Sequence, residues 1–358
     1  MNYKQRTDAI KTLMDSEGID WFFVTHPTNV RYLSGFTGSH GVLMTGREEC
    51  HILTDGRYQE QVALEVRDYR PVIQGTRKEL EAMKESLGDL SRCRVGFESE
   101  YCSVDRWEEM QKTLPAKSYV GKKGVVESLR AIKDEREIGA IRRALRTAET
   151  AIQKSLAHIR EGMMERELAH RIEDEMWKEG AEKESFESLV LFGARSSLCH
   201  GRPSDYRLKR GEPVLMDVGC VVDGYCSDIT RTVFLGAPNE EFKNIYEAVR
   251  RANLAAEEQI RAGVGGKEAD TFAREVIQKL GFGELFVHGL GHGVGLEIHE
   301  APRLSPLADQ NLQAGNVVTV EPGIYRPGFG GVRIEDMIVV RPNGCEVLTQ
   351  LDKNLITI

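Results

Sequence analysis

The sequence lacks the features that mark several classes of protein. Its seven cysteines include no C-x-x-C pair and are odd in number, which argues against a disulfide framework and against a cysteine-ligated zinc site. No apolar run approaches the roughly 20 residues that span a bilayer, and the first residues are polar rather than apolar. We therefore expect a soluble, cytoplasmic protein with reduced thiols at Cys50, Cys93, Cys102, Cys199, Cys220, Cys226 and Cys345.

The chain also lacks an excess of basic residues. Its formal net charge is −8, whereas a sequence-independent nucleic-acid binder would need a basic face. Its hydrophobic content of 41% and charged content of 29% are ordinary for a globular protein, and 358 residues suffice for two domains. We therefore expect neither a nucleic-acid nor a membrane partner.

A short segment with two glycines and two lysines, residues 120–124, divides the chain into two parts. Before it, short apolar strands alternate with helical stretches, which predicts a small α/β domain; the strands are expected at 21–24, 42–45, 51–54, 71–73 and 94–98. After it, amphipathic helices precede two groups of strands; the helices are expected at about 138–159, 164–179, 239–261 and 267–280. The sequence thus predicts domains at residues 1–124 and 125–358.

The stretch 214–231 is predicted to form a β-hairpin. Two apolar-rich runs flank Asp223-Gly224, and this pair of residue types tolerates the positive φ of a tight two-residue turn. With the turn there, Val222 opposes Tyr225 and the pairing continues along both strands.

Two aspartates share one face of this hairpin. Asp217 is expected to oppose Thr230, which makes Asp228 its diagonal neighbour across the ladder. Two carboxylates so placed repel each other and resist burial unless a cation or a proton lies between them. Strand aspartates can also simply face solvent, but the surrounding valines and leucine favour a metal or acid-pair site.

Residues 288–300 concentrate three histidines and four glycines. Glycine allows the backbone to approach another group closely, but it weakens helices, which argues against a helical H-x-x-x-H zinc motif. A phosphate-binding loop is also disfavoured, because no lysine follows. We interpret the segment as an irregular loop with one metal ligand and neighbouring substrate contacts, drawn from His288, His292 and His299.

Further candidates lie on either side of this loop. Glu321 ends a strand of β-branched residues, although an exposed strand-end glutamate is individually the commoner case. In the run 332–340, alternation places Arg333 and Glu335 on one face, where they could also be a simple ion pair. His200 precedes the hairpin, and a lone loop histidine is usually solvated.

Together these residues supply two aspartates, two glutamates and several histidines within one predicted domain. Carboxylate-rich sites with an imidazole suit manganese, cobalt or zinc, and carboxylates can bridge two ions. Two such ions can share a hydroxide and stabilise the oxyanion of a hydrolysis. No serine or cysteine lies in a nucleophile-elbow pattern, so metal-activated water is the favoured nucleophile.

The order of these side chains resembles the five-ligand set of the M24 metallopeptidases, which have the pita-bread fold. The resemblance covers the whole chain, because residues 29–36 and 54–58 are similar to the amino-terminal domain of proline-specific members. It implies an α/β (α+β) fold, with a creatinase-like amino-terminal domain before a catalytic domain of antiparallel sheet and flanking helices. Methionine aminopeptidases lack that first domain. The matching ligand positions are Asp217, Asp228, His292, Glu321 and Glu335.

The resemblance also implies a role for each residue. Asp217 would chelate one metal ion, His292 and Glu321 the other, and Asp228 and Glu335 would bridge both. Glu321 would also shuttle a proton during hydrolysis. The remaining site residues would contact the substrate backbone, polarise the scissile carbonyl or orient the site; they are His200, His288, His299 and Arg333.

The predicted activity is metal-dependent hydrolysis of the bond between an amino-terminal residue and proline. The segment Thr54–Tyr58 favours an enzyme of the aminopeptidase P type, and an Xaa-Pro dipeptidase (prolidase) is the alternative. A creatinase-like hydrolase and a non-enzymatic peptide-binding protein are less favoured, because all five ligand positions are intact. Two Mn²⁺ ions are the favoured cofactor, with Co²⁺ or Zn²⁺ as alternatives, and the resemblance suggests a homodimer.

Overall fold

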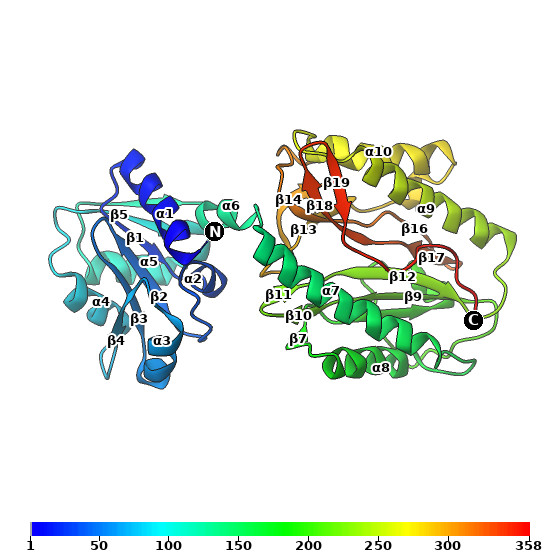
Figure 1. Ribbon diagram of the computed structural model, residues 1–358, viewed down its shortest axis with the longest axis horizontal. Helices are drawn as coiled ribbons and strands as arrows, with labels where there is room; N and C mark the ends of the chain where they lie inside the picture. The colour runs from blue at the N-terminus through cyan, green and yellow to red at the C-terminus, as the bar shows by residue number, and fades with distance from the viewer. Residues whose placement is uncertain (1) are drawn as a thin grey trace. The chain divides into compact units, whose positions relative to one another are not determined.

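A computed structural model describes residues 2–358, which form two compact units, one ending at Arg130 and the other spanning Ala131–Ile358 (Figure 1). Met1, the first residue of the predicted domain 1–124, lies outside the described residues. The boundary between the units follows Arg130 rather than Gly124, because helix α6 (Val125–Arg130) belongs to the first unit.

The first unit is built on a six-stranded mixed sheet with the strand order β4-β3-β2-β1-β5-β6. The pairs among β1, β2 and β3 are antiparallel, and the outer pairs are parallel. The strands are β1 (Trp21–Val24), β2 (Val42–Gly46), β3 (Cys50–Thr54), β4 (Arg70–Ile73), β5 (Arg94–Glu98) and β6 (Ser118–Lys122). The helices before α6 are α1 (Tyr3–Glu17), α2 (Pro27–Ser34), α3 (Gln59–Glu65), α4 (Glu79–Leu87) and α5 (Val104–Thr113), with short 3₁₀ turns η1 (Gly56–Tyr58) and η2 (Ser99–Tyr101).

The five predicted strands of this unit are confirmed, but the predicted linker at residues 120–124 is wrong. Most of it belongs to β6, in which Tyr119 and Val120 pair in parallel with Val95 and Gly96 of β5. Glycine and lysine are depleted in strands, so this segment does not resemble one. It forms a strand because it pairs with β5, and local composition does not reveal such pairing.

The second unit places four long helices around antiparallel strands (Figure 1). They are α7 (Glu135–Leu156), α8 (Glu165–Lys178), α9 (Glu240–Gln259) and α10 (Gly266–Lys279), close to the predicted bounds. Asp134 caps the start of α7: its side chain accepts from the amides of Arg136 and Glu137 at 2.9 and 3.0 Å. No helix within residues 2–358 is both long and apolar enough to cross a membrane.

The strands of the second unit form several small sheets, and all pairs of its named strands are antiparallel. The sheet orders are β12-β9-β8, β11-β10-β7, β14-β13-β15-β18-β19 and β16-β17. Their bounds are β7 (Lys183–Glu184), β8 (Leu189–Phe192), β9 (Pro213–Val218), β10 (Cys220–Val222), β11 (Tyr225–Cys226), β12 (Ile229–Phe234), β13 (Gly291–Gly293), β14 (Glu300–Leu304), β15 (Val317–Val320), β16 (Gly323–Arg326), β17 (Gly330–Arg333), β18 (Asp336–Arg341) and β19 (Gly344–Val347), with 3₁₀ turns η3 (Gly193–Ser197) and η4 (Gly283–Leu285).

Two apolar cores hold these layers together. One joins α7 and α8 to the sheet of β8, β9 and β12, through side chains such as Ile141, Ile172 and Met216. The other joins α9 and α10 to the five-stranded sheet, through side chains such as Val249 and Ile338. Strand ends from both layers carry the polar residues described below, so the cores fix their positions.

Candidate metal centre

The predicted hairpin is present with its predicted turn. Val222 pairs with Tyr225, and Asp223 and Gly224 have φ angles of 53° and 79°, as a two-residue turn with two positive φ angles requires. The hairpin is nevertheless divided at Gly219, so that its two halves join different sheets.

Gly219 is required at this division. A Cβ atom there would lie 2.0 Å from the carbonyl oxygen of Ser227 and 2.3 Å from the hydroxyl of Ser185. Only glycine allows the two backbones to approach so closely. Asp228 follows this close approach and lies between β11 and β12, immediately before the first residue of β12.

Asp217 lies in β9 opposite Thr230, in the register predicted from the sequence. Its Oδ2 accepts a hydrogen bond from Nη2 of Arg333. Its Oδ1 is buried and has no hydrogen-bond partner among residues 2–358. Leaving a buried carboxylate oxygen unpaired is costly, so this atom is suited to bind a cation.

Asp228 and Glu335 are the most deeply buried carboxylates of the site, at 5% and 1% exposure. Burial raises the pKa of each well above its usual value, and neighbouring carboxylates raise it further. Glu335 is held by Thr230, whose hydroxyl donates to Oε2 at 2.8 Å and whose carbonyl accepts from the Glu335 amide at 3.1 Å. The site therefore favours a proton or a cation between these side chains.

His292 lies in the short strand β13, not in an irregular loop as predicted. The glycines on either side serve close packing: a Cβ at Gly291 would lie 2.1 Å from the Thr319 carbonyl oxygen, and one at Gly293 would lie 2.3 Å from that of Ala301. Burial lowers the pKa of His292 to about 3, so its imidazole is neutral and able to act as a ligand.

His292 and Glu321 close the cluster. Nε2 of His292 lies 3.6 Å from Oδ2 of Asp228 and 3.4 Å from Oε1 of Glu321. Glu321 directly follows β15, as predicted, and the hydroxyl of Thr319 donates to its Oε1 at 3.2 Å. Burial raises the pKa of Glu321 to about 7.

All five predicted ligands line one cavity of about 770 Å³. Three of them, Asp228, His292 and Glu335, each offer an atom within 4.8 Å of the others, a spacing that suits a metal ion. The same cavity is lined by the other predicted site residues, His200, His288, His299 and Arg333. The structure thus brings together every site residue predicted from the sequence.

The predicted continuous strand over residues 332–340 is wrong. β17 ends at Arg333, β18 begins at Asp336, and the two strands belong to different sheets. Between them Glu335 bonds to Thr230 instead of continuing a ladder, so its side chain turns into the cavity. Because the strand is interrupted between Arg333 and Glu335, the predicted alternation does not determine which face these two residues occupy.

Arg333 and Tyr325 connect Asp217 to His288. Arg333 is 3% exposed, and its Nη1 donates to the hydroxyl of Tyr325 at 2.7 Å. This hydroxyl lies 2.9 Å from Nε2 of His288, whose Nδ1 lies 2.8 Å from the carbonyl oxygen of Gly289. Because a guanidinium only donates, Tyr325 is left to donate to Nε2 and Nδ1 to donate to the carbonyl.

The three histidines around the ligands differ in surroundings. His288 is half-buried, and burial lowers its pKa to about 4. The ring of His299 lies 4.4 Å from that of His292, and partial burial lowers its pKa. His200 is exposed at the cavity. His299 and His200 are thus the two whose ring nitrogens can meet a bound ligand.

Sequence reasoning missed two residues of this site. Tyr325 follows the Glu-Pro-Gly motif in β16 with no distinguishing spacing, and it reaches the site only because β16 pairs with β17. Arg303 lines the cavity because β14 places it opposite His292. Arg303 directly follows the cis Ala301-Pro302 bond, and nothing in the local sequence indicates that it lies at the site.

Two family models match the chain. Metallopeptidase family M24 matches residues 139–342, and the Creatinase/Prolidase N-terminal domain matches residues 6–132. The Xaa-Pro dipeptidase of Pyrococcus furiosus is 38% identical over 358 residues, covering 99% of this chain and 100% of that protein.

Two solved structures are similar along nearly the whole chain. The Xaa-Pro dipeptidase from Bacillus anthracis is 38% identical, with a TM-score of 0.96 and coverage of 100% of both chains. The X-Pro aminopeptidase from Thermotoga maritima is 36% identical, with a TM-score of 0.91 and coverage of 95% and 98%. The likeness includes both units.

Proposed function

The chain belongs to metallopeptidase family M24, and on this premise we propose that it hydrolyses the bond before proline in Xaa-Pro dipeptides. The observation that carries the proposal is the cluster of four carboxylates and one imidazole on the wall of a single cavity. Such a donor set suits metal-dependent hydrolysis.

The donor residues fit two divalent ions, which Asp217, Asp228, His292, Glu321 and Glu335 would hold. Support comes from the unpaired buried oxygen of Asp217 and from the raised pKa of Asp228 and Glu335, since a bound cation would relieve both. Asp228 and Glu335 are the proposed bridging ligands. Mn²⁺ is favoured by the oxygen-rich donors, with Co²⁺ or Zn²⁺ as alternatives. When bound, the ions supply an activated water and polarise the scissile carbonyl.

Glu321 is the proposed proton shuttle. Glu321 lines the cavity, and Thr319 donates to its Oε1; the carboxylate would accept a proton and return it to the leaving proline nitrogen. His299 and His200 would donate to the substrate backbone, and His299 would help to polarise the carbonyl. Because both ring nitrogens of His288 have partners, its ring would bound the cavity.

Arg333 is the proposed orienting residue of the site. Its guanidinium contacts Asp217 and Tyr325, and Nε donates to the hydroxyl of Thr230 at 3.0 Å. Thr230 in turn binds Glu335, so one buried cation sets the positions of two proposed ligands.

Two observations favour a dipeptide over a longer peptide as the proposed substrate. The sequence favours an aminopeptidase, but the relatives named Xaa-Pro dipeptidase support the prolidase alternative more strongly. In addition, Arg303 provides an exposed cation on the cavity wall, opposite His292. A dipeptide carries its carboxylate next to the scissile bond, where this cation would be within reach.

The test compares turnover of Xaa-Pro with that of Xaa-Pro-Yaa-Zaa by the full-length protein supplied with Mn²⁺, Co²⁺ or Zn²⁺ in turn. We expect hydrolysis of the dipeptide alone. Equal cleavage of the tetrapeptide would make the protein an aminopeptidase. Hydrolysis of neither peptide with any metal would overturn the proposal, and so would a metal-supplemented protein that retains no divalent ion.

We also propose that the protein is a cytoplasmic homodimer. The dimer is suggested by the family resemblance, and the location by seven free cysteines among residues 2–358, which suit a reducing compartment. Light scattering coupled to size-exclusion chromatography tests the dimer: a mass of one chain, 40.2 kDa, would contradict it.

A further inference from the structure

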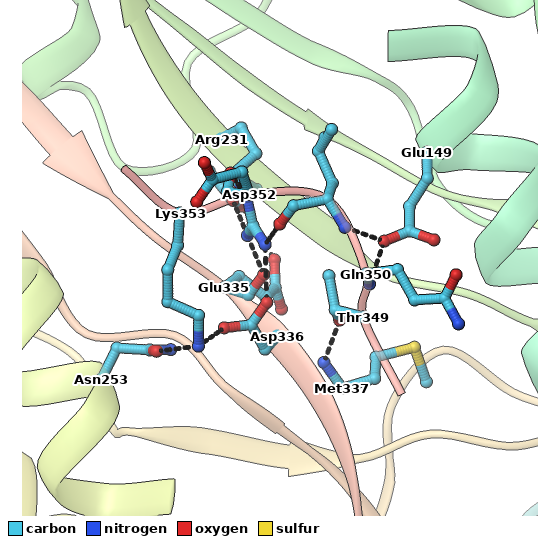
Figure 2. A network of polar contacts seen from close by, with 12 residues as sticks. Glu149, Arg231, Asn253, Glu335, Asp336, Met337, Thr349, Gln350, Asp352 and Lys353 are labelled. Atoms are coloured by element: carbon cyan, nitrogen blue, oxygen red, sulfur yellow. Dashed lines mark hydrogen bonds and ion pairs between the residues drawn. The ribbon is translucent and has the colours of Figure 1, made fainter. Parts of the chain in front are cut away.

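A network of polar and charged side chains surrounds the backbone next to Glu335, one of the proposed metal ligands (Figure 2). Its centre is Arg231, whose side chain is 3% exposed. Nη1 of Arg231 donates to the carbonyl oxygens of Glu335 at 2.6 Å and Thr230 at 3.0 Å, and Nη2 donates to Oδ1 of Asp336 at 2.7 Å. Arg231 thus holds the backbone carbonyl of Glu335 and the side chain of the next residue, Asp336.

Lys353, from the carboxy-terminal segment, completes this network. Its ammonium lies 2.5 Å from Oδ2 of Asp336, an ion pair without the geometry of a directed hydrogen bond. It also donates to the carboxylate of Glu257 at 2.8 and 2.9 Å and to Oδ1 of Asn253 at 2.8 Å. The Asp336 side chain is 0% exposed, so it depends on Lys353 and Arg231 for its neutralisation.

Asn253 carries the network to a second ligand. It is fully buried in α9, and its Nδ2 donates to the carbonyl oxygen of Val320 at 2.9 Å. Val320 is the residue before Glu321. The two arms from Lys353 therefore end one residue away from Glu335 and one residue away from Glu321.

The segment that carries Lys353 is itself anchored to the second unit. Oε1 of Glu149 accepts from the amide of Leu351 at 2.6 Å, and Arg231 donates to the carbonyl oxygens of Leu351 at 2.5 Å and Asp352 at 3.1 Å. Tyr246 donates to the carbonyl oxygen of Asn354 at 3.1 Å. The ammonium is therefore held in place by its own backbone as well as by its partners.

We propose that Lys353 is a positioning residue for the metal centre, holding Glu335 through Asp336 and Glu321 through Asn253. The inference rests on the proposed ligand set. Two cations, Arg231 and Lys353, neutralise the buried carboxylates of Asp336 and Glu257, and this balance fixes the backbone from which the two ligands project. Metal ligands require placement to within about 0.5 Å, so a relaxed backbone weakens binding before it unfolds the protein.

Lys353→Met tests this proposal, because it keeps most of the aliphatic stem and removes the charge. Glu257 would then lose its cation, Asp336 would keep only Arg231, and the two carboxylates would repel each other. The matched control is Lys279→Met, which removes a lysine that is 74% exposed and pairs with Glu275 on the same helix, α10. Lys353→Arg restores the charge.

Each full-length protein is loaded with Mn²⁺ and equilibrated against chelator-buffered free Mn²⁺, and the retained metal is measured by elemental analysis. We expect Lys353→Met to raise the Kd for Mn²⁺ on the order of 10–100-fold relative to Lys279→Met, with Lys353→Arg closer to the wild type. A ratio below about tenfold, or an arginine variant no better than the methionine variant, would overturn the proposal.

Thermal unfolding at saturating Mn²⁺ separates a folding defect from a positioning defect. If Lys353→Met does not fold, Asn253→Ala replaces it, because this substitution removes the contact that links Lys353 to the backbone next to Glu321. The Kd for Mn²⁺ is then measured in the same way, and a rise below about tenfold would again overturn the proposal. A wild-type protein that retains no Mn²⁺ would refute the proposed metal centre itself. Unchanged retention by Lys353→Met beside a metal-binding wild type would refute only the role of Lys353.

Discussion

Asp228→Asn removes one of the buried carboxylates that repel one another at the centre of the site. Burial and then the carboxylates of Glu335, Asp217 and Glu321 raise the pKa of Asp228 well above 3.8. The folded, metal-free protein therefore binds the Asp228 proton more tightly than the unfolded chain does. Its stability falls as the pH rises above about 4, and asparagine, which has nearly the same shape, removes this loss. The metal-free variant should be more stable than the metal-free wild type, increasingly so towards pH 8.

The same substitution should abolish the stabilisation by metal. At a free Mn²⁺ concentration of 100 times Kd, binding stabilises the folded state by about 2.7 kcal/mol. For a unit the size of Ala131–Ile358, this corresponds to a rise in Tm of roughly 5–10 °C. We expect this rise in the wild type and none in Asp228→Asn, which should also lack peptidase activity.

Differential scanning calorimetry with and without Mn²⁺, at pH 5 and pH 8, measures both effects. Asp223→Asn is the matched control, because Asp223 belongs to the same hairpin but lies at the exposed turn and pairs with Arg143. The control should show the full Mn²⁺ response. A metal-free Asp228→Asn protein less stable than the wild type at pH 8 would refute the argument from buried like charges, and a retained Mn²⁺ response would refute the ligand assignment.

Three further substitutions test other parts of the account. Arg303→Met should lower kcat/KM for an Xaa-Pro dipeptide about tenfold, the loss of one charge-assisted hydrogen bond, but leave Xaa-Pro-amide nearly unaffected; an equal loss on both substrates would contradict carboxylate recognition. Arg333→Met should destabilise the metal-free protein by about 3–5 kcal/mol in urea unfolding, because Asp217 loses its buried counter-ion, and a change below about 1 kcal/mol would count against that pair. Gly219→Ala should lower the free energy of unfolding by about 1–3 kcal/mol in the same assay, because the new Cβ atom clashes with Ser227. A variant as stable as the wild type would show that the backbone at this position shifts to accommodate the methyl group.

The central hairpin was predictable because its information is local. The Asp223-Gly224 turn sets the register, and the register alone places Asp217 opposite Thr230. The membership in family M24 is predicted from the order and context of the five proposed ligands, and the amino-terminal α/β domain from its strand–helix alternation and residues 29–36 and 54–58; the family comparison confirms both.

The errors have a common physical cause, which is pairing between distant segments. Residues 332–340 alternate like one strand, but Glu335 leaves the ladder to bind Thr230 of another sheet. β6 resembles a linker until it pairs with β5. His292 lies on a strand because its flanking glycines admit neighbouring backbones, and the sequence shows the glycines without their partners.

The site residues that sequence reasoning missed have the same explanation. Arg303 reaches the cavity through the pairing of β14 with β13, and Tyr325 reaches Arg333 and His288 through the pairing of β16 with β17. Lys353 reaches Asp336 because the carboxy-terminal segment folds back along the second unit, as the bond from the Phe234 amide to Ile356 illustrates. No periodicity in the sequence indicates these contacts between distant segments.

The central claim is that the buried carboxylates form a dinuclear centre that hydrolyses Xaa-Pro dipeptides. Its most direct test strips the full-length protein of metal with a chelator and follows dipeptide hydrolysis while Mn²⁺ is returned. We expect no hydrolysis by the stripped protein and recovery that saturates at two equivalents of Mn²⁺ per chain. Hydrolysis that survives stripping, or that does not return with Mn²⁺, Co²⁺ or Zn²⁺, would contradict it.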